Sequence, residues 1–429
     1  MKNQRFRLGI FAIAAIVATA VNAIIFVSAT AVGASMRVTT LGESTSGIVN
    51  VIAGTFVSLM FAAAVLKLIL TKRPDFAVTA SWLGLGFAVI SAALPLMAGD
   101  DLLTGASLAS MHLVGGLGWI VGARVANQST SPKLAMKGFP DHSLTIQPVL
   151  VESLDLTGRR VIVFGGTDGL GRAIARLAAS RGAEVTVVGR TFRDEGVKGL
   201  QFVKADLSSM KEAQRVGREM VVESTDVLLL TTGVIAAKQR EVTSEGIERD
   251  MAVSFLSRLV LLQGMAHRLG TERAAAPVPR IFVMGFPGTG GLGNLDDLTG
   301  ERTYSWSEVH MNTVAGNEAL VLEGARRSSA VHYFGLNPNL IKTDIRGPVL
   351  GGGIMHRVVE FFIGLFTQSA EGYAKRIVPL LFAEELDARN GVMFGHKANP
   401  ILPSKGMTDA YVGQFIEESQ QLVENALLR

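Results

Sequence analysis

Three glycines that follow an apolar run have the spacing of a phosphate-binding loop. In VIVFGGTDGLGRAIARLAAS, Gly165, Gly169 and Gly171 lie between an expected strand and an expected helix. A backbone without side chains can approach a pyrophosphate, whose charge then faces the positive end of the helix. Glycines that only make a tight turn are the alternative. We predict a dinucleotide phosphate site formed by Gly165, Thr167, Gly169, Leu170 and Gly171.

The end of the next expected strand carries a basic residue, Arg190. An acidic residue at this place would bind the adenosine ribose hydroxyls of NAD(H), whereas an arginine favours the 2′-phosphate of NADP(H). The sequence therefore favours NADP(H) as the cofactor, with NAD(H) as the alternative. Arg190 as an ordinary surface arginine is the competing interpretation.

One histidine has the chemistry to move a proton. His310 opens the stretch HMNTVAGN, and imidazole titrates near neutrality, so this side chain can serve as an acid or a base. No carboxylate or amine partner for it is evident from the sequence. A remnant, or a hydrogen-bonded wall residue, is therefore the competing interpretation. The chain has no cysteine, which excludes thiolate metal sites and cysteine nucleophiles, and we predict no metal site.

The elements that would position these residues alternate between short apolar runs and longer amphipathic segments from Thr157 onward. This alternation predicts an α/β Rossmann-like, doubly wound parallel sheet covered by helices on both faces, over residues 151–429. The expected strands are 159–166, 183–190, 200–207, 226–233, 280–286, 330–338 and 392–396. Three prolines between residues 126 and 150 indicate a linker before it.

The first quarter of the chain is far more apolar. Four stretches with few charged residues lie at 8–36, 47–70, 76–99 and 102–123. A bilayer core about 30 Å thick needs roughly 20 such residues, and the apolar part of a signal peptide is shorter. We therefore predict an α-helical four-span membrane bundle over residues 1–125. Its small residues would let the helices pack closely, and His112 would bond to a neighbouring helix.

The charges that flank these stretches predict their orientation. Lysine and arginine lie before the first, between the second and third, and after the fourth, whereas the other two loops hold Arg37 with Glu43 and Asp100 with Asp101. Positive charge stays on the cytoplasmic side, so we expect a multi-pass protein of the inner (plasma) membrane with both termini and the Rossmann domain cytoplasmic. The net charge of +4 thus reflects topology and not nucleic-acid binding. Expected partners are membrane lipid, an apolar small-molecule substrate or none, and a second copy in a homo-oligomer.

Several segments of the later part resemble the short-chain dehydrogenase/reductase family, in its retinol-dehydrogenase-like branch, from Thr157 to the C-terminal region. They are ADL at 205–207, TSEGIERDMAVSFL at 243–256, LDDLTGERTYS at 295–305 and NPNLIKTDI at 337–345, with Asn339 in place of a glycine. The resemblance implies further cofactor contacts at Asp206, Leu207, Gly233, Pro338 and Thr343. The first 125 residues are similar to an uncharacterised four-span family of actinobacteria.

The family's chemistry, as the resemblance implies it, uses an asparagine, a serine, a tyrosine and a lysine four residues after the tyrosine. This sequence has Ser254, Phe286, His310 and Val314 at those places. A second register places the tyrosine and lysine positions at Thr313 and Asn317. A third uses Tyr304, where Glu308 would raise the pKa of the phenol. Residues 283–331 contain no lysine, so no register restores the pair.

Two functions remain compatible with these residues. One is a membrane-anchored NADP(H)-dependent oxidoreductase that acts on an apolar carbonyl or alcohol, with His310 or water as the acid. The other is a pseudoenzyme that binds a dinucleotide, or only a partner, as a sensor or scaffold for the membrane bundle. A helical apolar face in residues 351–366 would pack on the core or on the substrate cleft, or rest on the bilayer surface.

Overall fold

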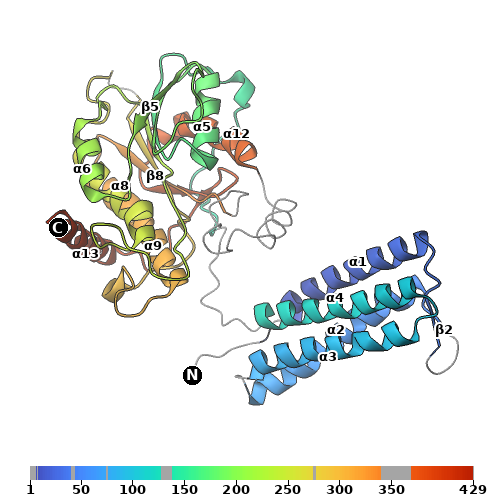
Figure 1. Cartoon of the computed structure of the whole chain (residues 1–429). Helices are drawn as coiled ribbons and strands as arrows, with labels where there is room; N and C mark the ends of the chain where they lie inside the picture. Colours follow the sequence, from blue (N-terminus) through green and yellow to red (C-terminus); the bar gives the residue numbers. More distant parts are fainter. Residues whose placement is uncertain are drawn as a thin grey trace. The chain divides into compact units, whose positions relative to one another are not determined.

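The chain forms two compact units, Met1–Lys133 and Leu134–Arg429 (Figure 1). The structure, a computed structural model, describes residue 6 and residues 8–39, 44–73, 76–126, 138–273, 277–339 and 369–428. Thr343 and the apolar face predicted at 351–366 lie outside these described residues. Each unit is built around its own core.

Four long helices make up the first unit: α1 (Leu8–Ala31), α2 (Ile48–Lys72), α3 (Phe76–Ala98) and α4 (Leu102–Ala126). All four are long and apolar enough to cross a membrane, which confirms the four predicted apolar helices. The first ends at Ala31 and not at Met36 as expected. The chain then forms a short antiparallel pair, β1 (Arg37–Val38) with β2 (Ser44–Thr45).

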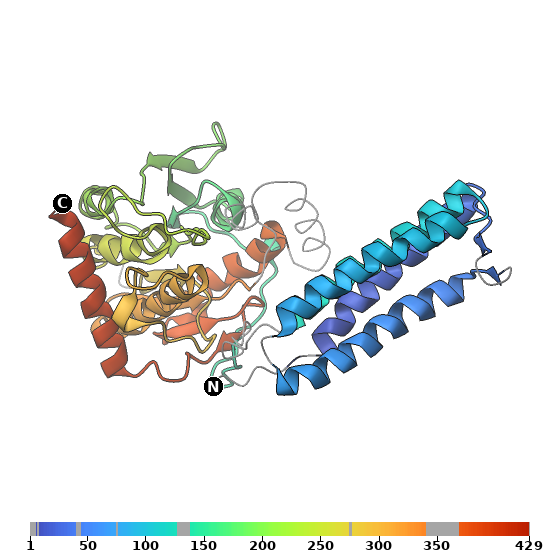
Figure 2. The same ribbon diagram turned by 60° about the horizontal axis from the view of Figure 1, so that its bottom comes forward.

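Small residues determine how closely these helices pack. A Cβ at Gly118 of α4 would lie 2.8 Å from the Cβ of Ala18 on α1, and one at Gly122 would lie 2.9 Å from the Phe11 ring. Figure 2 shows α3 and α4 close together, with α2 packed mainly on α1. His112 is bonded to Ser91 of α3 at 2.9 Å, the neighbouring-helix bond that the sequence favoured.

The second unit contains a sheet in the order β5-β4-β3-β6-β7-β8-β9-β10. Every neighbouring pair is parallel except β9 with β10. This is the predicted doubly wound arrangement, in which ligands bind beyond the carboxyl ends of the strands. The strands are β3 (Arg160–Phe164), β4 (Glu184–Gly189), β5 (Leu200–Lys204), β6 (Val227–Leu230), β7 (Arg280–Met284), β8 (His332–Leu336), β9 (Val392–Phe394) and β10 (Pro400–Ile401).

Helices cover both faces of this sheet (Figure 1). Val161 and Val163 of β3 face one core and Ile162 and Phe164 the other, because successive side chains of a strand point to opposite faces. One face carries α5 (Gly169–Ser180) and α12 (Ala370–Leu381), which pack together. The other carries α6 (Met210–Glu219), α8 (Ser257–Met265), α9 (Trp306–Arg327) and α13 (Asp409–Leu427).

The segment predicted as a linker is in part built into the second unit. Pro140 forms a bridge with Ile401 of β10, and the Gln147 N–H donates to Glu385 at 2.8 Å. Leu144 and Ile146 pack against the core that α5 and α12 cover. Residues 138–150 are therefore held by the sheet domain, whereas α4 extends to Ala126.

Candidate functional site

The glycine loop turns tightly between β3 and α5. Gly165 has φ 79°, and a Cβ there would lie 2.6 Å from the backbone nitrogen of Thr232. A Cβ at Gly171 would lie 2.3 Å from the Thr231 hydroxyl and 2.4 Å from the Gly165 carbonyl oxygen. These two glycines are needed for close packing of the loop on the end of β6, where a larger residue would push the loop away from the sheet.

The helix that follows presents unpaired N–H groups. It begins at Gly169, with φ 51°, and Asp168 caps it by accepting from the Gly169 N–H at 2.9 Å. The next N–H groups, of Leu170 and Gly171, have no partner inside the helix because the first turn has no preceding carbonyl groups. Thr167 is buried beside Gly189 at the end of β4. This end of the sheet fits the pyrophosphate of a dinucleotide.

Several arginines lie near the end of β4, and most of them form ion pairs with aspartates. Asp194 is buried and binds Arg172 through two bonds of 2.8 and 2.7 Å, and it also binds Arg176. Arg193 pairs with Asp168 at 3.1 Å. Arg190 is exposed, and among the described residues it has no hydrogen bond or ion pair. Its charge is therefore available to a ligand.

The places expected to contact the rest of the dinucleotide lie at the same edge of the sheet. Asp206 follows β5, is exposed, and accepts from the N–H and hydroxyl of Ser208 at 3.1 and 2.8 Å, while Leu207 is buried behind it. Gly233 follows β6 and leaves open space, since a Cβ would come no closer than 3.5 Å to another atom.

After β8, Pro338 is buried and Asn339 has φ 58°. Asparagine tolerates this left-handed conformation better than most residues, which explains how it can stand where the resembling family has glycine.

Three of the four expected catalytic places hold residues that cannot do the family's usual chemistry. Phe286 follows β7 with φ 58°, a strained conformation for a large side chain. Val314 on α9 is 4% exposed and lies in the interior. Ser254 keeps a polar group, but its hydroxyl is bonded within the protein: it accepts from the Val234 N–H at 3.0 Å and lies 2.5 Å from an Asp250 oxygen.

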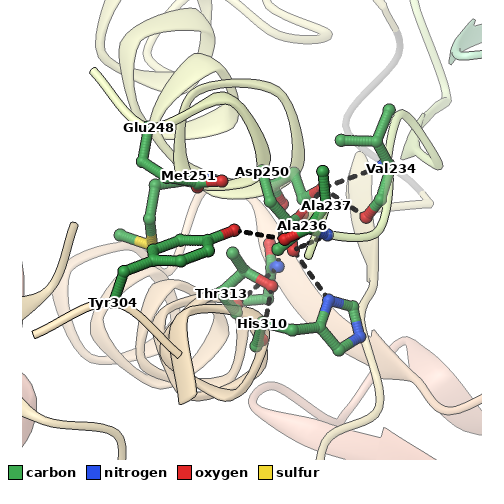
Figure 3. A network of polar contacts seen from close by, with 11 residues as sticks. Val234, Ala236, Ala237, Glu248, Asp250, Met251, Tyr304, His310 and Thr313 are labelled. Atoms are coloured by element: carbon green, nitrogen blue, oxygen red, sulfur yellow. Dashed lines mark hydrogen bonds and ion pairs between the residues drawn. The ribbon is translucent and has the colours of Figure 1, made fainter. Parts of the chain in front are cut away.

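At the fourth place, His310 has a carboxylate partner that the sequence did not reveal. The Nδ1 atom of His310 lies 2.8 Å from Oδ2 of Asp250, on the short helix α7 (Arg249–Met251). The same Asp250 oxygen accepts from the Ala236 N–H at 3.1 Å. Figure 3 shows this network, with the other ring nitrogen of His310 pointing away from it. Asp250 is fully buried, while 26% of the His310 side chain is exposed.

The charges at this place favour a protonated histidine. Burial lowers the pKa of His310, but the hydrogen bond and charge of Asp250, with the charge of Glu248, outweigh it and raise the pKa above its ordinary value. Glu248 caps α7 by accepting from the Met251 N–H at 2.8 Å. Its other oxygen has no hydrogen bond within the described structure, and burial raises its pKa to about 7.

Tyr304, the phenol of the third register, is not a substitute acid. Its hydroxyl donates to the Ala237 carbonyl at 2.6 Å. Burial, then the charges of Glu248, Asp250 and Glu241, raise its pKa to about 12. The direction is the predicted one, but the cause differs, because Glu308 is bonded to Asn294 instead.

A buried arginine, Arg258, lies next to these residues, and it was not identified from the sequence. Arg258 of α8 donates to the Met284 carbonyl at 2.6 Å, to Asn317 at 2.8 Å and to the Thr232 carbonyl. It thereby links the ends of β6 and β7 to α9. Burial lowers the pKa of Arg258 to about 9, although the charge of Asp250 acts in the opposite direction. The group therefore stays charged at neutral pH.

The missed residues carried a weak sequence signal. Asp250 and Ser254 are four apart and so share a helix face, but nothing in the sequence says that this face meets His310, 60 residues later. In the structure the π-helical turn η2 (Ala252–Leu256) follows α7 directly, and Asn317 of α9 donates to the Ser254 carbonyl at 2.9 Å. Such turns are frequent at functional sites.

Comparisons with known proteins divide the chain in the same way. The family described as short chain dehydrogenase matches residues 159–276, and a family of unknown function, DUF6069, matches residues 2–129. A Saccharomyces cerevisiae protein described as an uncharacterized oxidoreductase is 47% identical over 283 residues, covering 65% of this chain and 92% of its own. Human retinol dehydrogenase 14 is 25% identical over 299 residues, covering 62% and 86%.

Among solved structures, that of an uncharacterized protein from Mycobacterium paratuberculosis is similar with a TM-score of 0.48 at 19% identity, covering 65% of this chain and 98% of that one. A Shigella flexneri short chain dehydrogenase in complex with NADP is similar with a TM-score of 0.43 at 16% identity, covering 57% and 100%.

Proposed function

Because the chain belongs to the short-chain dehydrogenase/reductase family, we propose that it is a membrane-anchored oxidoreductase that uses NADP(H) to interconvert an apolar carbonyl compound and its alcohol. The observation that carries the cofactor choice is Arg190, exposed and without a partner in the described residues while Arg172, Arg176 and Arg193 are paired with acids. A free guanidinium at the end of β4 favours a 2′-phosphate.

The residues that would hold the cofactor follow from the geometry. The N-terminus of α5, at Gly169, Leu170 and Gly171, would receive the pyrophosphate, and Asp206 and Gly233, which follow β5 and β6, would contact other parts of the dinucleotide. When bound, the dinucleotide supplies or accepts a hydride. The protein's own part is to orient the substrate and to provide or remove one proton.

The apolar substrate is proposed from two features. Four helices able to cross a membrane precede the sheet domain, which suits a substrate that dissolves in lipid. Phe286 occupies the place of a polar residue in the family, so this wall of the site suits hydrocarbon. The flanking charges favour the plasma membrane, with both termini and the sheet domain cytoplasmic, where nicotinamide cofactors are found.

Binding of NADPH tests this function without knowledge of the substrate. The full chain in detergent should show saturable enhancement of NADPH fluorescence and bind NADPH more tightly than NADH. Replacing Arg190 by alanine should weaken NADPH binding by about tenfold or more and leave NADH binding nearly unchanged, because only NADPH carries the extra phosphate. Arg193→Ala, which removes an exposed ion-paired arginine of the same loop, is the matched control. A flat titration would refute both the phosphate site and the role of Arg190.

A second function is favoured by one specific observation. Phe286 and Val314 supply neither the hydroxyl nor the ammonium that the family's usual chemistry needs. A protein that binds the dinucleotide without turning it over would act as a sensor or scaffold for the membrane helices. NADPH binding with no hydride transfer to any lipid-soluble carbonyl would favour this alternative.

A further inference from the structure

The imidazole of His310 is held by one nitrogen. Nδ1 lies 2.8 Å from the Asp250 carboxylate, which fixes the plane and the tautomer of the ring. Nε2 has no hydrogen bond among the described residues, and a quarter of the side chain is exposed. A histidine held in this way can present Nε2 as a donor or acceptor of a proton, as in hydrolases where a carboxylate orients the histidine.

The carboxylate is itself held firmly. Asp250 has no exposed surface, and its two oxygens accept from His310, the Ala236 N–H and the Ser254 hydroxyl. Ser254 has a single proton and two acceptors within reach, Asp250 at 2.5 Å and the Val234 carbonyl at 3.2 Å. The Ser254 hydroxyl donates to the nearer acceptor, Asp250. Ser254, at the place of the family's asparagine, therefore stabilises the Asp250 carboxylate.

We propose that His310 is the acid–base residue of this protein and that Asp250 is the residue that positions it, so that a histidine–carboxylate pair replaces the family's tyrosine and lysine. This inference rests on the proposed function. For each hydride that a carbonyl carbon accepts from the dinucleotide, the carbonyl oxygen must gain one proton. The Nε2–H bond of the imidazolium breaks, the O–H bond of the alcohol forms, and His310 is left neutral until it takes a proton from water.

The surrounding charges support this assignment. Asp250 contacts the ring directly, and its charge, with that of Glu248 at the N-terminus of α7, favours the protonated form. Tyr304 does not compete with His310 for Asp250, because the Tyr304 hydroxyl donates to the Ala237 carbonyl. A buried carboxylate is costly unless it is paired, and His310 supplies a positive partner to Asp250 when its ring is protonated.

Titration of the ring tests the pair without any substrate. In the full chain with isotope-labelled histidine, His310 is one of seven histidines and is assigned by its loss in His310→Gln. Its pKa should lie above the ordinary imidazole value. In Asp250→Asn it should fall below that value, because burial remains and the charge is gone. Glu308→Gln, which removes a nearby acid bonded to Asn294, should leave it unchanged.

Turnover separates proton transfer from structure. His310→Gln keeps a donor for Asp250 but cannot exchange a proton, so it should retain NADPH affinity and lose at least about 100-fold in kcat for NADPH-dependent reduction of long-chain aldehydes. Asp250→Asn should move the alkaline fall of the rate to lower pH, since reduction needs the protonated ring. Glu308→Gln should match the wild type.

Two results would overturn the proposal: an unchanged His310 pKa in Asp250→Asn, and a His310→Gln protein that still reduces aldehydes at the wild-type rate. A wild-type protein that binds NADPH but reduces no aldehyde would contradict the proposed oxidoreductase function together with it. Absence of NADPH binding would instead refute the proposed function, and the titration of His310 would still report whether the histidine–carboxylate pair exists.

Discussion

At the scale of single residues, the site is distinguished by three buried ionisable groups. Asp250, Glu248 and Arg258 all lie within the helices beside β6 and β7, and each is almost entirely buried. Burial of ionisable groups is costly unless they are paired. Both Asp250 oxygens and both terminal nitrogens of Arg258 are hydrogen-bonded. One Glu248 oxygen and the Arg258 Nε have no hydrogen bond in the part of the chain that the structure describes.

Glu248 should therefore make the protein less stable as the pH rises. Its folded-state pKa of about 7 lies above the ordinary value of 4.5. Below pH 4.5 both states are protonated and the group contributes nothing; between pH 4.5 and 7 the unfolded state releases its proton first, so stability falls. Glu248→Gln should remove this fall and add on the order of 2 kcal/mol above pH 7.

Thermal unfolding of the full chain at several pH values measures this difference. Glu241→Gln, at an exposed acid that pairs with Arg249, should change stability by no more than about 0.5 kcal/mol. Parallel pH curves for Glu248→Gln and the wild type would contradict the assigned shift.

The residue scale also shows what sequence alone could and could not supply. The positions of the glycine loop and of Arg190 could be predicted because each follows directly from a local strand, turn and helix. The pairing of His310 with Asp250 was not, because it joins two helices 60 residues apart. The local pattern showed only that the usual tyrosine and lysine were missing. It did not identify Asp250 as the partner of His310.

At the scale of elements, the alternation of apolar runs was sufficient for the sheet. Strands covered on both faces carry continuous apolar side chains, as β6 does with VLLL, and they are easy to identify. The ends of the elements were predicted less accurately. The helix α1 ends at Ala31, five residues before the end of the apolar stretch at residue 36. The proline-rich segment predicted as a linker also contributes Pro140, Leu144 and Ile146 to the sheet domain, because composition does not show tertiary contacts.

The orientation of the four long helices is a prediction about elements. The chain has no cysteine, so single cysteines report topology directly. An impermeant maleimide on intact cells should label Arg37→Cys, between α1 and α2, but not Thr71→Cys at the end of α2. After lysis both should react, as should Lys198→Cys on the sheet domain. Labelling of Thr71→Cys in intact cells, with Arg37→Cys protected, would reverse the proposed topology.

At the scale of the whole molecule, one chain contains two units that differ in how apolar their surfaces are. Met1–Lys133 is a bundle of helices with many large apolar side chains on its surface, and Leu134–Arg429 has two apolar cores around a single sheet. In the proposed function, the bundle holds the oxidoreductase domain at the bilayer surface. Tethering raises the effective concentration of a lipid-soluble substrate without any new contact, which is a physical reason for joining the two units.

Transfer of the nicotinamide hydrogen is the most direct test of whether this molecule is an oxidoreductase. Membranes containing the full chain would be incubated with NADPH deuterated at both C4 positions and a set of long-chain aldehydes, and the lipid alcohols analysed by mass spectrometry. We expect deuterium at the carbinol carbon with wild-type protein and almost none with His310→Gln. Saturable NADPH binding with no deuterium in any alcohol would contradict this expectation and leave a dinucleotide-binding pseudoenzyme.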